Sequence, residues 1–534
     1  MSKRIRSLGI GTVVSIVTTF VLVATVIAGA KPNVGTADVD IIAVNPDTTE
    51  SASVSIQFYS TDGTAGPTRN ETLDALHAAE YTADSSGFSG SFQGVAVVSS
   101  NRELGIVGTI NWAGGETTDG IKYGQYAGVK APSDILYFPN VVYDTAGSVG
   151  VQNTTMSVQN TSSSAVTAYV SWTNLGGVRD FRYSISVPAN GSVVMDTSNW
   201  DTGGADDVPN LTGTSYWSTW DSWAGGVVVT STQPVLAGAA HVAWRQWAAG
   251  YAAVSEGGTR LFYPSVERRE YNVVNNGRFG GGTSNWGGLS AIAVTNLDLT
   301  ASGVVTFTFI DSLGLIPNKV FAAPLAAGGT VRMNTHSGMK IGTTLYYDHD
   351  DLKVLDRYPT NPSTREWVGS VIVESSGPPI VGTSNNLYLD YNKADLYEAA
   401  PDGGGNYSVV VPDVYRVTGG DFSLLRIQNM STGQATINAT FYDRSGASKL
   451  QFVNYQLNSY EVATPNLARA CFGDGSTSCT KPWELTVSGS GLGGAYQGWI
   501  MVTSDEPIVV TVENWFGGNS HFGMGAYNGI GITP

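Results

Sequence analysis

The sequence has little charge, and most of that charge is negative. Only 13% of its 534 residues are Asp, Glu, Lys or Arg, yet the formal net charge is −16. A protein that binds nucleic acid needs clustered Lys and Arg to neutralise phosphates, so this balance argues against a nucleic-acid partner. It also argues against electrostatic docking onto anionic lipid.

Motifs of common catalytic and metal sites are missing as well. The chain contains no H-E-x-x-H, no G-x-S-x-G and no Walker A loop. Its five histidines lack the spacing of metal ligands: His77, His241, His336, His349 and His521. We therefore predict no catalytic residues and a protein that is not an enzyme. A secreted hydrolase with paired carboxylates is the catalytic alternative, although the sequence singles out no such pair.

Long apolar runs are confined to the N-terminus. A basic stretch at residues 3–6 is followed by an apolar run from about Leu8 to Ala30, which ends in Ala28-Gly29-Ala30. This pattern predicts a secretory signal peptide that is cleaved after Ala30. Because the run is long for a signal peptide, an uncleaved N-terminal anchor remains the alternative. No later run is long enough to span a bilayer, so we expect the rest of the chain to be secreted.

Cysteine is nearly absent, with only Cys471 and Cys479 in the chain. Outside the cytosol these two residues are expected to form a disulfide. A redox or metal pair is the alternative, but no further Cys or His stands nearby to complete a metal site.

What the sequence does have is glycine, with 65 residues, and an internal repeat. One hairpin-like segment occurs four times, with Gly opening an apolar strand, Ser six residues later and a turn after that. The copies begin and end at Gly94 and Ser100, Gly225 and Ser231, Gly369 and Ser375, and Gly498 and Ser504. A second apolar strand follows each copy and reaches an aromatic residue at a similar offset: Trp112, Trp244, Tyr388 and Trp515.

Two further landmarks recur with this segment. An apolar strand ends in Asn45, Asn160, Asn296 and Asn429, and a strand with aromatic residues follows each of them. The side chains of Asn160 and Asn429 are expected to form turns. Tyr137-Phe138-Pro139, Phe262-Tyr263-Pro264 and Val410-Val411-Pro412 each open a new copy. The boundaries that follow are a signal peptide over 1–30 and four repeats over 31–133, 134–259, 260–405 and 406–534.

Repeats of this length are the size of self-sufficient domains. Short strands with period-two alternation and Gly-rich turns predict an all-β fold of four tandem, antiparallel, immunoglobulin-like β-sandwich domains. One short helix is expected from Asn70 to Ala83, where helix-forming residues gather. Four domains in a row would form a rod.

The repeats resemble a known kind of surface protein. The segment from Asp40 to Gly63 has an apolar strand, Asn-Pro, a polar turn, a β-branched strand, Phe-Tyr and Asp-Gly, and related segments surround Asn296 and Asn429. With the closing stretch from Phe522 to Gly529, these features resemble the uncharacterised extracellular tandem β-sandwich surface proteins of filamentous bacteria such as the Chloroflexota. The resemblance implies an extracellular β-sandwich array and supplies no catalytic residue or ligand.

Two segments are candidates for binding. Asp348, Asp350 and Asp351 are carboxylates in one loop that could hold Ca²⁺, although the glycine of a calcium loop is missing. Tyr216, Trp217, Trp220 and Trp223 form an aromatic cluster that could stack on sugar rings. Packing against the sandwich core is the alternative for these aromatic residues, and a solvated loop is the alternative for the aspartates.

Taken together, these features predict a secreted, non-enzymatic structural protein of the cell surface. Self-association into a filament, sheath or surface layer is the expected assembly. An adhesin that binds cell-surface glycans through the aromatic cluster is the alternative.

Overall fold

The computed structural model describes residues 18–22, 36–82, 87–88, 92–113, 122–143, 145–147, 150–177, 179–197, 223–244, 248–270, 286–341, 344–357, 365–388, 393–417, 420–469, 471–472, 478–479, 485–516 and 524–533. These residues form antiparallel β-sheets, as predicted for an all-β protein. Within the described part of the chain, no helix is long and apolar enough to cross a membrane.

The strands fall into four successive units. Unit 1 contains β1 (Thr18–Leu22), β2 (Thr36–Val44), β3 (Ala52–Ser60), β4 (Arg69–Leu73), β5 (Ala78–Thr82), β6 (Gly94–Ser100), β7 (Gly105–Ala113) and β8 (Lys122–Ala127). Unit 2 contains β9 (Ile135–Tyr143), β10 (Thr145–Gly147), β11 (Gly150–Asn160), β12 (Val166–Asn174), β13 (Arg179–Val187), β14 (Ser192–Asp196), β15 (Trp223–Ser231), β16 (Leu236–Trp244) and β17 (Ala248–Ala252).

Unit 3 contains β18 (Arg260–Glu270), β19 (Trp286–Asn296), β20 (Gly303–Asp311), β21 (Lys319–Leu325), β22 (Thr330–Asn334), β23 (Gly338–Ile341), β24 (Thr344–Tyr347), the 3₁₀ helix η4 (Asp351–Leu355), β25 (Arg365–Ser375), β26 (Ile380–Tyr388), β27 (Lys393–Glu398) and β28 (Ala400–Pro401). Unit 4 contains β29 (Asn406–Val417), β30 (Phe422–Asn429), β31 (Ala435–Asp443), β32 (Ser448–Leu457), β33 (Val462–Ala463), β34 (Ser478–Cys479), β35 (Leu485–Gly489), β36 (Ala495–Trp515), β37 (Met524–Asn528) and β38 (Ile530–Gly531).

One pairing scheme recurs in all four units. In unit 1 the sheets have the orders β1-β6-β3-β4 and β5-β2-β7-β8. Unit 2 repeats them as β9-β15-β12-β13 and β14-β11-β16-β17, and unit 3 as β18-β25-β20-β21 and β22-β19-β26-β27. In unit 4 the long strand β36 serves both sheets, because its first half pairs with β29 and β31 and its second half with β30 and β37. We call β1, β9, β18 and β29 the opening strands, and β8, β17, β27 and β37 the closing strands.

The scheme shares part of the immunoglobulin pattern. The pairs β2–β5 and β3–β6 correspond to the B–E and C–F pairs of that sandwich. The strand after β6, however, joins the opposite sheet and pairs with β2. An antiparallel β-sandwich is therefore what the pairing supports, and the immunoglobulin-like assignment stays a prediction.

The recurring glycine makes room for an aromatic ring. In each unit the ring belongs to the residue two positions before the glycine and folds back over it. The four pairs are Phe92 and Gly94, Trp223 and Gly225, Trp367 and Gly369, and Tyr496 and Gly498. A Cβ on Gly225 would lie 2.8 Å from the Trp223 ring, closer than side chains tolerate. All four aromatic side chains are buried.

The recurring asparagine ties two turns together. The Nδ2 group of Asn160 donates to the carbonyl oxygens of Ser164 (2.7 Å) and Pro188 (3.0 Å). Its Oδ1 accepts from the backbone N–H of Ser162 at 2.9 Å. The same arrangement is found at Asn45, Asn296 and Asn429. The turn-forming role predicted for Asn160 and Asn429 is confirmed, and Asn45 and Asn296 share it.

The proline of each later opening strand marks a bulge, where the pairing register shifts. A buried tyrosine of the closing strand bonds to the backbone of the residue that follows this proline. Tyr397 OH bonds to the N–H (3.0 Å) and C=O (2.5 Å) of Ser265, Tyr527 OH to the N–H (3.0 Å) and C=O (3.0 Å) of Asp413, and Tyr251 OH to the C=O of Asn140 (3.2 Å). The tyrosine therefore satisfies backbone groups that the bulge takes out of the ladder.

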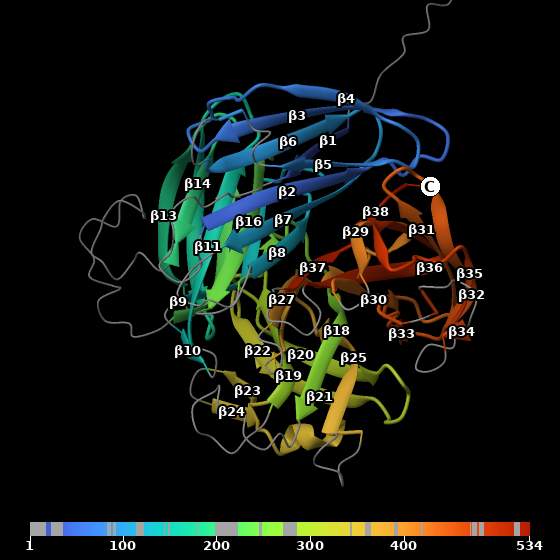
Figure 1. Cartoon of the computed structure of the whole chain (residues 1–534). Helices are drawn as coiled ribbons and strands as arrows, with labels where there is room; N and C mark the ends of the chain where they lie inside the picture. Colours follow the sequence, from blue (N-terminus) through green and yellow to red (C-terminus); the bar gives the residue numbers. More distant parts are fainter. Residues whose placement is uncertain are drawn as a thin grey trace, which may run out of the picture.

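The four units surround a common centre instead of forming a rod. The closing strands meet there, with β8 against β17, β17 against β27, β27 against β37, and β37 against β8. Figure 1 shows unit 1 at the top, unit 2 at the left, unit 3 at the bottom and unit 4 at the right. Hydrophobic cores continue across the boundaries, since Leu289 and Leu396 of unit 3 belong to the core of unit 2. The expected rod is wrong, because contacts between units 4 and 1 close the array.

The expected helix from Asn70 to Ala83 is also wrong. Over its described residues this segment forms β4 and β5, which lie in different sheets. Leu76, between them, has a positive φ of 64°, which no right-handed helix contains. The helix propensity of these residues is overridden by pairing with β3 and β2.

Candidate functional site

Buried charged side chains gather where the units meet. Glu267, Lys393, Asp395, Asp413, Arg426 and Glu513 are all at most 4% exposed. Charged residues are rarely buried unless they are paired, so this central junction is the candidate functional site.

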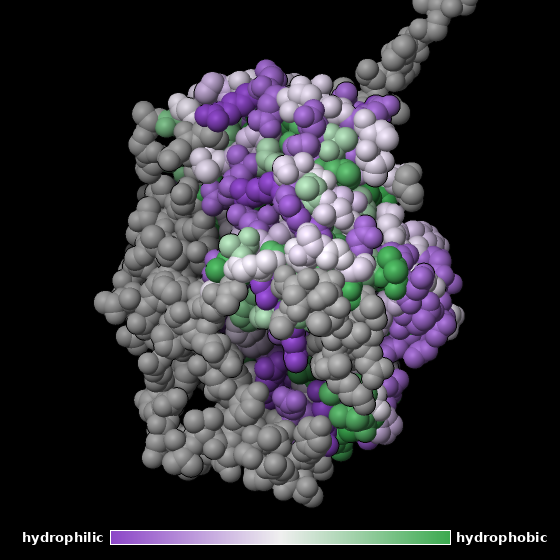
Figure 2. Space-filling view, turned by 45° about the vertical axis from the view of Figure 1, so that its right-hand side comes forward, coloured by the Kyte–Doolittle hydropathy of each residue, from purple (hydrophilic) through white to green (hydrophobic). Residues whose placement is uncertain are grey.

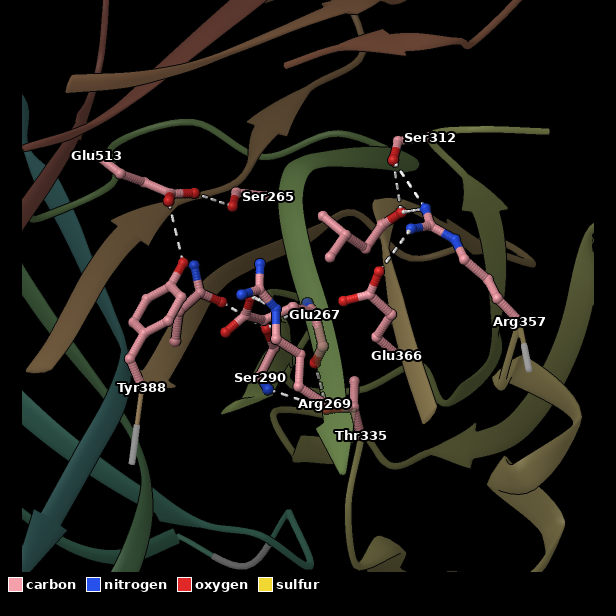
Figure 3. A network of polar contacts seen from close by, with 12 residues as sticks. Ser265, Glu267, Arg269, Ser290, Ser312, Thr335, Arg357, Glu366, Tyr388 and Glu513 are labelled. Atoms are coloured by element: carbon pink, nitrogen blue, oxygen red, sulfur yellow. Dashed lines mark hydrogen bonds and ion pairs between the residues drawn. The ribbon is translucent and has the colours of Figure 1, made fainter. Parts of the chain in front are cut away.

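Glu513 of unit 4 is the hub of the contact with unit 3. Its carboxylate accepts hydrogen bonds from the hydroxyls of Ser265 and Tyr388, the latter at 3.0 Å. Arg426 Nε forms an ion pair with the same carboxylate at 3.1 Å. Figure 3 shows Ser265 and Tyr388 converging on Glu513 from two strands of unit 3. One carboxylate thus joins two strands of the neighbouring unit to its own.

Two further carboxyl groups lie beside this hub. Glu267 pairs with Arg269 at 2.9 Å, and burial raises the pKa of Glu267 to about 7. The pKa of Asp395 is raised well above its usual range, first by burial and then by the charges of Glu513 and Glu267. A buried carboxyl next to other carboxylates is stabilised in its neutral form, so the surroundings of Glu267 and Asp395 favour their protonated forms.

Lys393 crosses the same boundary. Its Nζ donates to the carbonyl oxygen of Phe516 at 2.9 Å and lies 4.9 Å from the centroid of the Trp515 ring. Burial lowers the pKa of Lys393 to about 8.

The boundary between units 4 and 1 has a comparable cluster. Asp413 accepts hydrogen bonds from Gln125 Nε2 (3.2 Å) and Tyr415 OH (2.6 Å). Asn514 Nδ2 donates to Gln125 Oε1 at 3.0 Å and so completes the link. Burial raises the pKa of Asp413 to about 7.

The boundary between units 2 and 3 follows the same plan. Arg332 donates to Asn140 Oδ1 at 2.6 Å, and burial lowers the pKa of Arg332 to about 10. The carboxylate of Glu398 accepts from the backbone N–H of Ala252, and burial raises the pKa of Glu398 to about 7. In units 2, 3 and 4, therefore, the residue after the opening-strand proline contacts the next unit: Asn140, Ser265 and Asp413.

A second polar cluster stays within unit 3. Arg357 forms an ion pair with Asp311 at 2.6 Å. It also donates to Ser312 Oγ at 3.0 Å (Figure 3). Glu366 lies 4.0 Å from the same guanidinium. These contacts hold the loop after η4 against the end of β20.

The contacts of the central junction join neighbouring units. Its carboxyl groups are buried, and those of Glu513, Asp413 and Glu398 accept hydrogen bonds from groups of their own or the adjoining unit. The carboxyl oxygens of Asp395 have no hydrogen-bond partner among the described residues. Across the described ranges, no group of three or more His, Cys, Asp or Glu is arranged to hold a metal ion. The junction is thus suited to joining units and to responding to pH.

The candidate glycan-contact residues are only partly within the described residues. Trp223 is 2% exposed and packs edge to face on Trp172, with the ring centroids 5.5 Å apart. It is the unit 2 member of the aromatic–glycine pairs, so its ring is core and not available to a sugar. Tyr216, Trp217 and Trp220 lie outside the described residues.

The candidate calcium loop is a turn that begins a 3₁₀ helix. Asp348 Oδ1 accepts from the backbone N–H of Asp350 (2.8 Å) and of Asp351 (3.0 Å). Asp350 forms an ion pair with Lys353 at 2.7 Å. The loop also brings His349 near His336, whose ring centroid lies 5.3 Å away. The aspartates therefore bond to the backbone and to a lysine, as in the solvated-loop alternative.

Cys471 is buried and disulfide-bonded, and Cys479 is the other cysteine of the chain. The side chain of Cys479 lies outside the described residues.

The sequence analysis missed the central junction. A signal was present, because Asp395 stands between Ala394 and Leu396, and Glu513 follows Val512, at places in a strand where an unpaired charge would be costly. Their partners could not be identified, because they belong to other units.

Comparisons with known proteins add no relative. No protein-family model matches the chain, and no curated protein matches it.

Proposed function

We propose that the chain is a secreted structural protein of the cell surface that assembles with copies of itself into a filament, sheath or layer. The observation that supports it best is the use of the recurring residues. The repeated glycine, asparagine, proline and tyrosine all serve packing, turns or bulges within the units. Since these repeated residues stabilise the units themselves, the repeat is suited to a structural subunit of a larger assembly.

The proposed building block is the closed set of four tandem immunoglobulin-like sandwiches. Heterologous contacts between equivalent units can close into a ring, and here four covalently linked units do so. Polymer contacts then have to come from the outer surface of this body. Figure 2 shows that the face it draws is a mixture of hydrophilic patches and smaller hydrophobic groups. Exposed apolar side chains on β20 and β21 include Val304 and Val320.

Export is supported by the N-terminal pattern and by the disulfide at Cys471, since disulfides persist mainly in oxidising compartments. The non-enzymatic assignment rests on the missing sequence motifs and on the structural character of the central junction. The glycan-binding alternative now depends on Trp217, Trp220 and Tyr216, because Trp223 is in the core.

Negative-stain electron microscopy of the purified processed chain tests this proposal. A compact body of this length is about 60 Å across, whereas four separate domains in line would reach about 150 Å. We expect filaments or sheets that repeat at about the smaller spacing. Single particles at every concentration and ionic strength would contradict assembly.

A further inference from the structure

The opening strand of unit 1 comes from the apolar run that was predicted to be a signal peptide. Strand β1 pairs antiparallel with β6, with Phe20 opposite Val98 and Leu22 opposite Ala96. In sheet order β1 is the edge strand, followed by β6, β3 and β4. Removal of the run would therefore leave β6 as the edge of this sheet.

The register of β1 is the register of the other three opening strands. Counted from the recurring serine of each unit, Phe20 matches Leu136, Leu261 and Val409, which face Val229, Val373 and Val502. Leu22 likewise matches Phe138, Tyr263 and Val411, which face Val227, Val371 and Ile500. The apolar run thus supplies the residues that the pairing scheme needs at this place.

Spacing along the chain is compatible with this register. Phe20 precedes the recurring Asn45 by 25 residues, and the equivalent spacings in units 2, 3 and 4 are 24, 35 and 20 residues. The spacing of β1 thus lies within the range of the other opening strands, and the register in the sheet is what identifies it as one of them.

The β6 edge lacks the usual protection of an exposed strand. Its sequence, Gly-Val-Ala-Val-Val-Ser-Ser, holds neither charge nor proline. The opposite edge strand of the same sheet, β4, has Arg69 and Glu71. Charges and prolines keep free edges from pairing with other chains, whereas an apolar edge without them accepts a strand.

We propose that the β6 edge is a strand-acceptor site, and that Thr18–Leu22 of the same chain is the strand that occupies it. The apolar run then has a folding role besides the export role expected from its sequence. After cleavage at Ala30 the site is filled only if this segment stays bound. The inference does not depend on the proposed surface role, because it concerns unit 1 alone.

The other units indicate which positions of the segment matter. Leu136 and Phe138, which match Phe20 and Leu22, are buried. Ile135 and Tyr137, which match Thr19 and Val21, are half-buried. We expect charge at positions 20 and 22 to abolish binding and charge at 19 and 21 to be tolerated.

The test uses the processed chain, residues 31–534, and a synthetic peptide of residues 16–24 with solubilising lysines at both ends. We expect calorimetric binding, a rise of several degrees in the first thermal unfolding step, and slower hydrogen exchange along β6. The peptide with Thr19→Lys and Val21→Lys should bind similarly, and the peptide with Phe20→Lys and Leu22→Lys at least tenfold more weakly.

Three results would overturn the inference. They are a folded processed chain that binds no peptide, equal binding of the two lysine-substituted peptides, and self-association of the processed chain through the β6 edge, seen as slow hydrogen exchange along β6 before any peptide is added. The last would assign the edge to a second copy. If the processed chain does not fold, the same two pairs of substitutions are compared in the full chain, where only Phe20→Lys with Leu22→Lys should speed hydrogen exchange along β6. Equal exchange in both full-chain variants would also overturn it.

Discussion

At the scale of single residues, the structure shows why this protein carries glycine at fixed places in apolar strands. Gly225 gives the Trp223 ring and the carbonyl oxygen of Thr173 room that a methyl group would take. Glycine costs conformational entropy in a strand, so its recurrence needs such a reason.

Gly225→Ala is expected to destabilise unit 2 by about 2–3 kcal/mol, because the ring or the strand has to move in a packed core. Gly377→Ala is the control, since a Cβ there meets nothing within 4 Å, and we expect a change below about 0.5 kcal/mol. Urea unfolding followed by tryptophan fluorescence measures both. Equal effects of the two substitutions would show that the close approach of the Trp223 ring to Gly225 does not contribute to stability.

Asn160→Ala is expected to cost about 2–4 kcal/mol, because it leaves the buried carbonyl oxygen of Val187 and the partly buried ones of Ser164 and Pro188 without their donor. The exposed Asn70 is the control, and Asn70→Ala should be nearly neutral. Chemical denaturation of both variants checks this. A neutral Asn160→Ala would mean that water replaces the amide.

At the scale of elements, the opening and closing strands hold each other through tyrosine. Tyr397 and Tyr527 bond to both backbone groups of the residue after the proline, and Tyr251 bonds to one. The bulge and the tyrosine are far apart in the chain, but the tyrosine hydroxyl stabilises the bulge by bonding to its backbone groups.

Tyr397→Phe and Tyr527→Phe are each expected to lower the free energy of unfolding by about 2–3 kcal/mol, because a buried backbone N–H and a buried C=O both lose their partner. Tyr251→Phe is expected to lower it by about 1 kcal/mol, because only one C=O loses its partner. Tyr169 is 40% exposed, so Tyr169→Phe serves as the control. Thermal unfolding ranks the four variants. A larger loss at Tyr251 than at Tyr397 would contradict this account of the bulge.

The elements also show what the sequence can and cannot reveal. The strands from Gly225 to Ser231 and the turns at Asn160 were predictable, since their signals lie within a few residues of one another. The error over Asn70 to Ala83 has a different cause. Its helix propensity is local, but pairing of β4 with β3 and of β5 with β2 outweighs it.

The candidate site was not predictable for a related reason. Trp223 could be assigned to core or to ligand contact only by knowing that its ring covers Gly225. The junction around Glu513 needs the register of strands from two units, and no local pattern encodes that register.

At the scale of the whole molecule, four units close around buried polar contacts. Because the array is closed, every unit has a neighbour on both sides. In an open array the end units would expose a face, but here β37 packs on β8. The polar groups of Asp413 and Gln125 complete this last boundary. Removing one partner of a buried polar pair costs more than the pair contributes, so the closed arrangement is specified by these contacts.

These contacts make the closed body sensitive to pH. Burial raises the pKa of Glu267, Glu398 and Asp413 to about 7, whereas unfolded carboxyl groups titrate near 4. An acid with a raised pKa in the folded state contributes most stability when it is protonated in both states. That contribution declines as pH rises from about 4 to about 7. Lys393, with its pKa lowered to about 8, changes stability only above that window.

The melting temperature should therefore be higher at pH 5 than at pH 8, with each acid contributing up to about 3 kcal/mol. Asp413→Asn removes one titrating group, and its amide oxygen still accepts from Gln125 and Tyr415, so the variant should show a flatter pH profile. Exposed Asp62 is the control, because Asp62→Asn leaves the slope between pH 5 and 8 unchanged. Calorimetric scans across this range measure the slope. A melting temperature that falls from pH 8 to pH 5 would show that the junction acids are ionised in the folded protein, and that other charges hold the four units together.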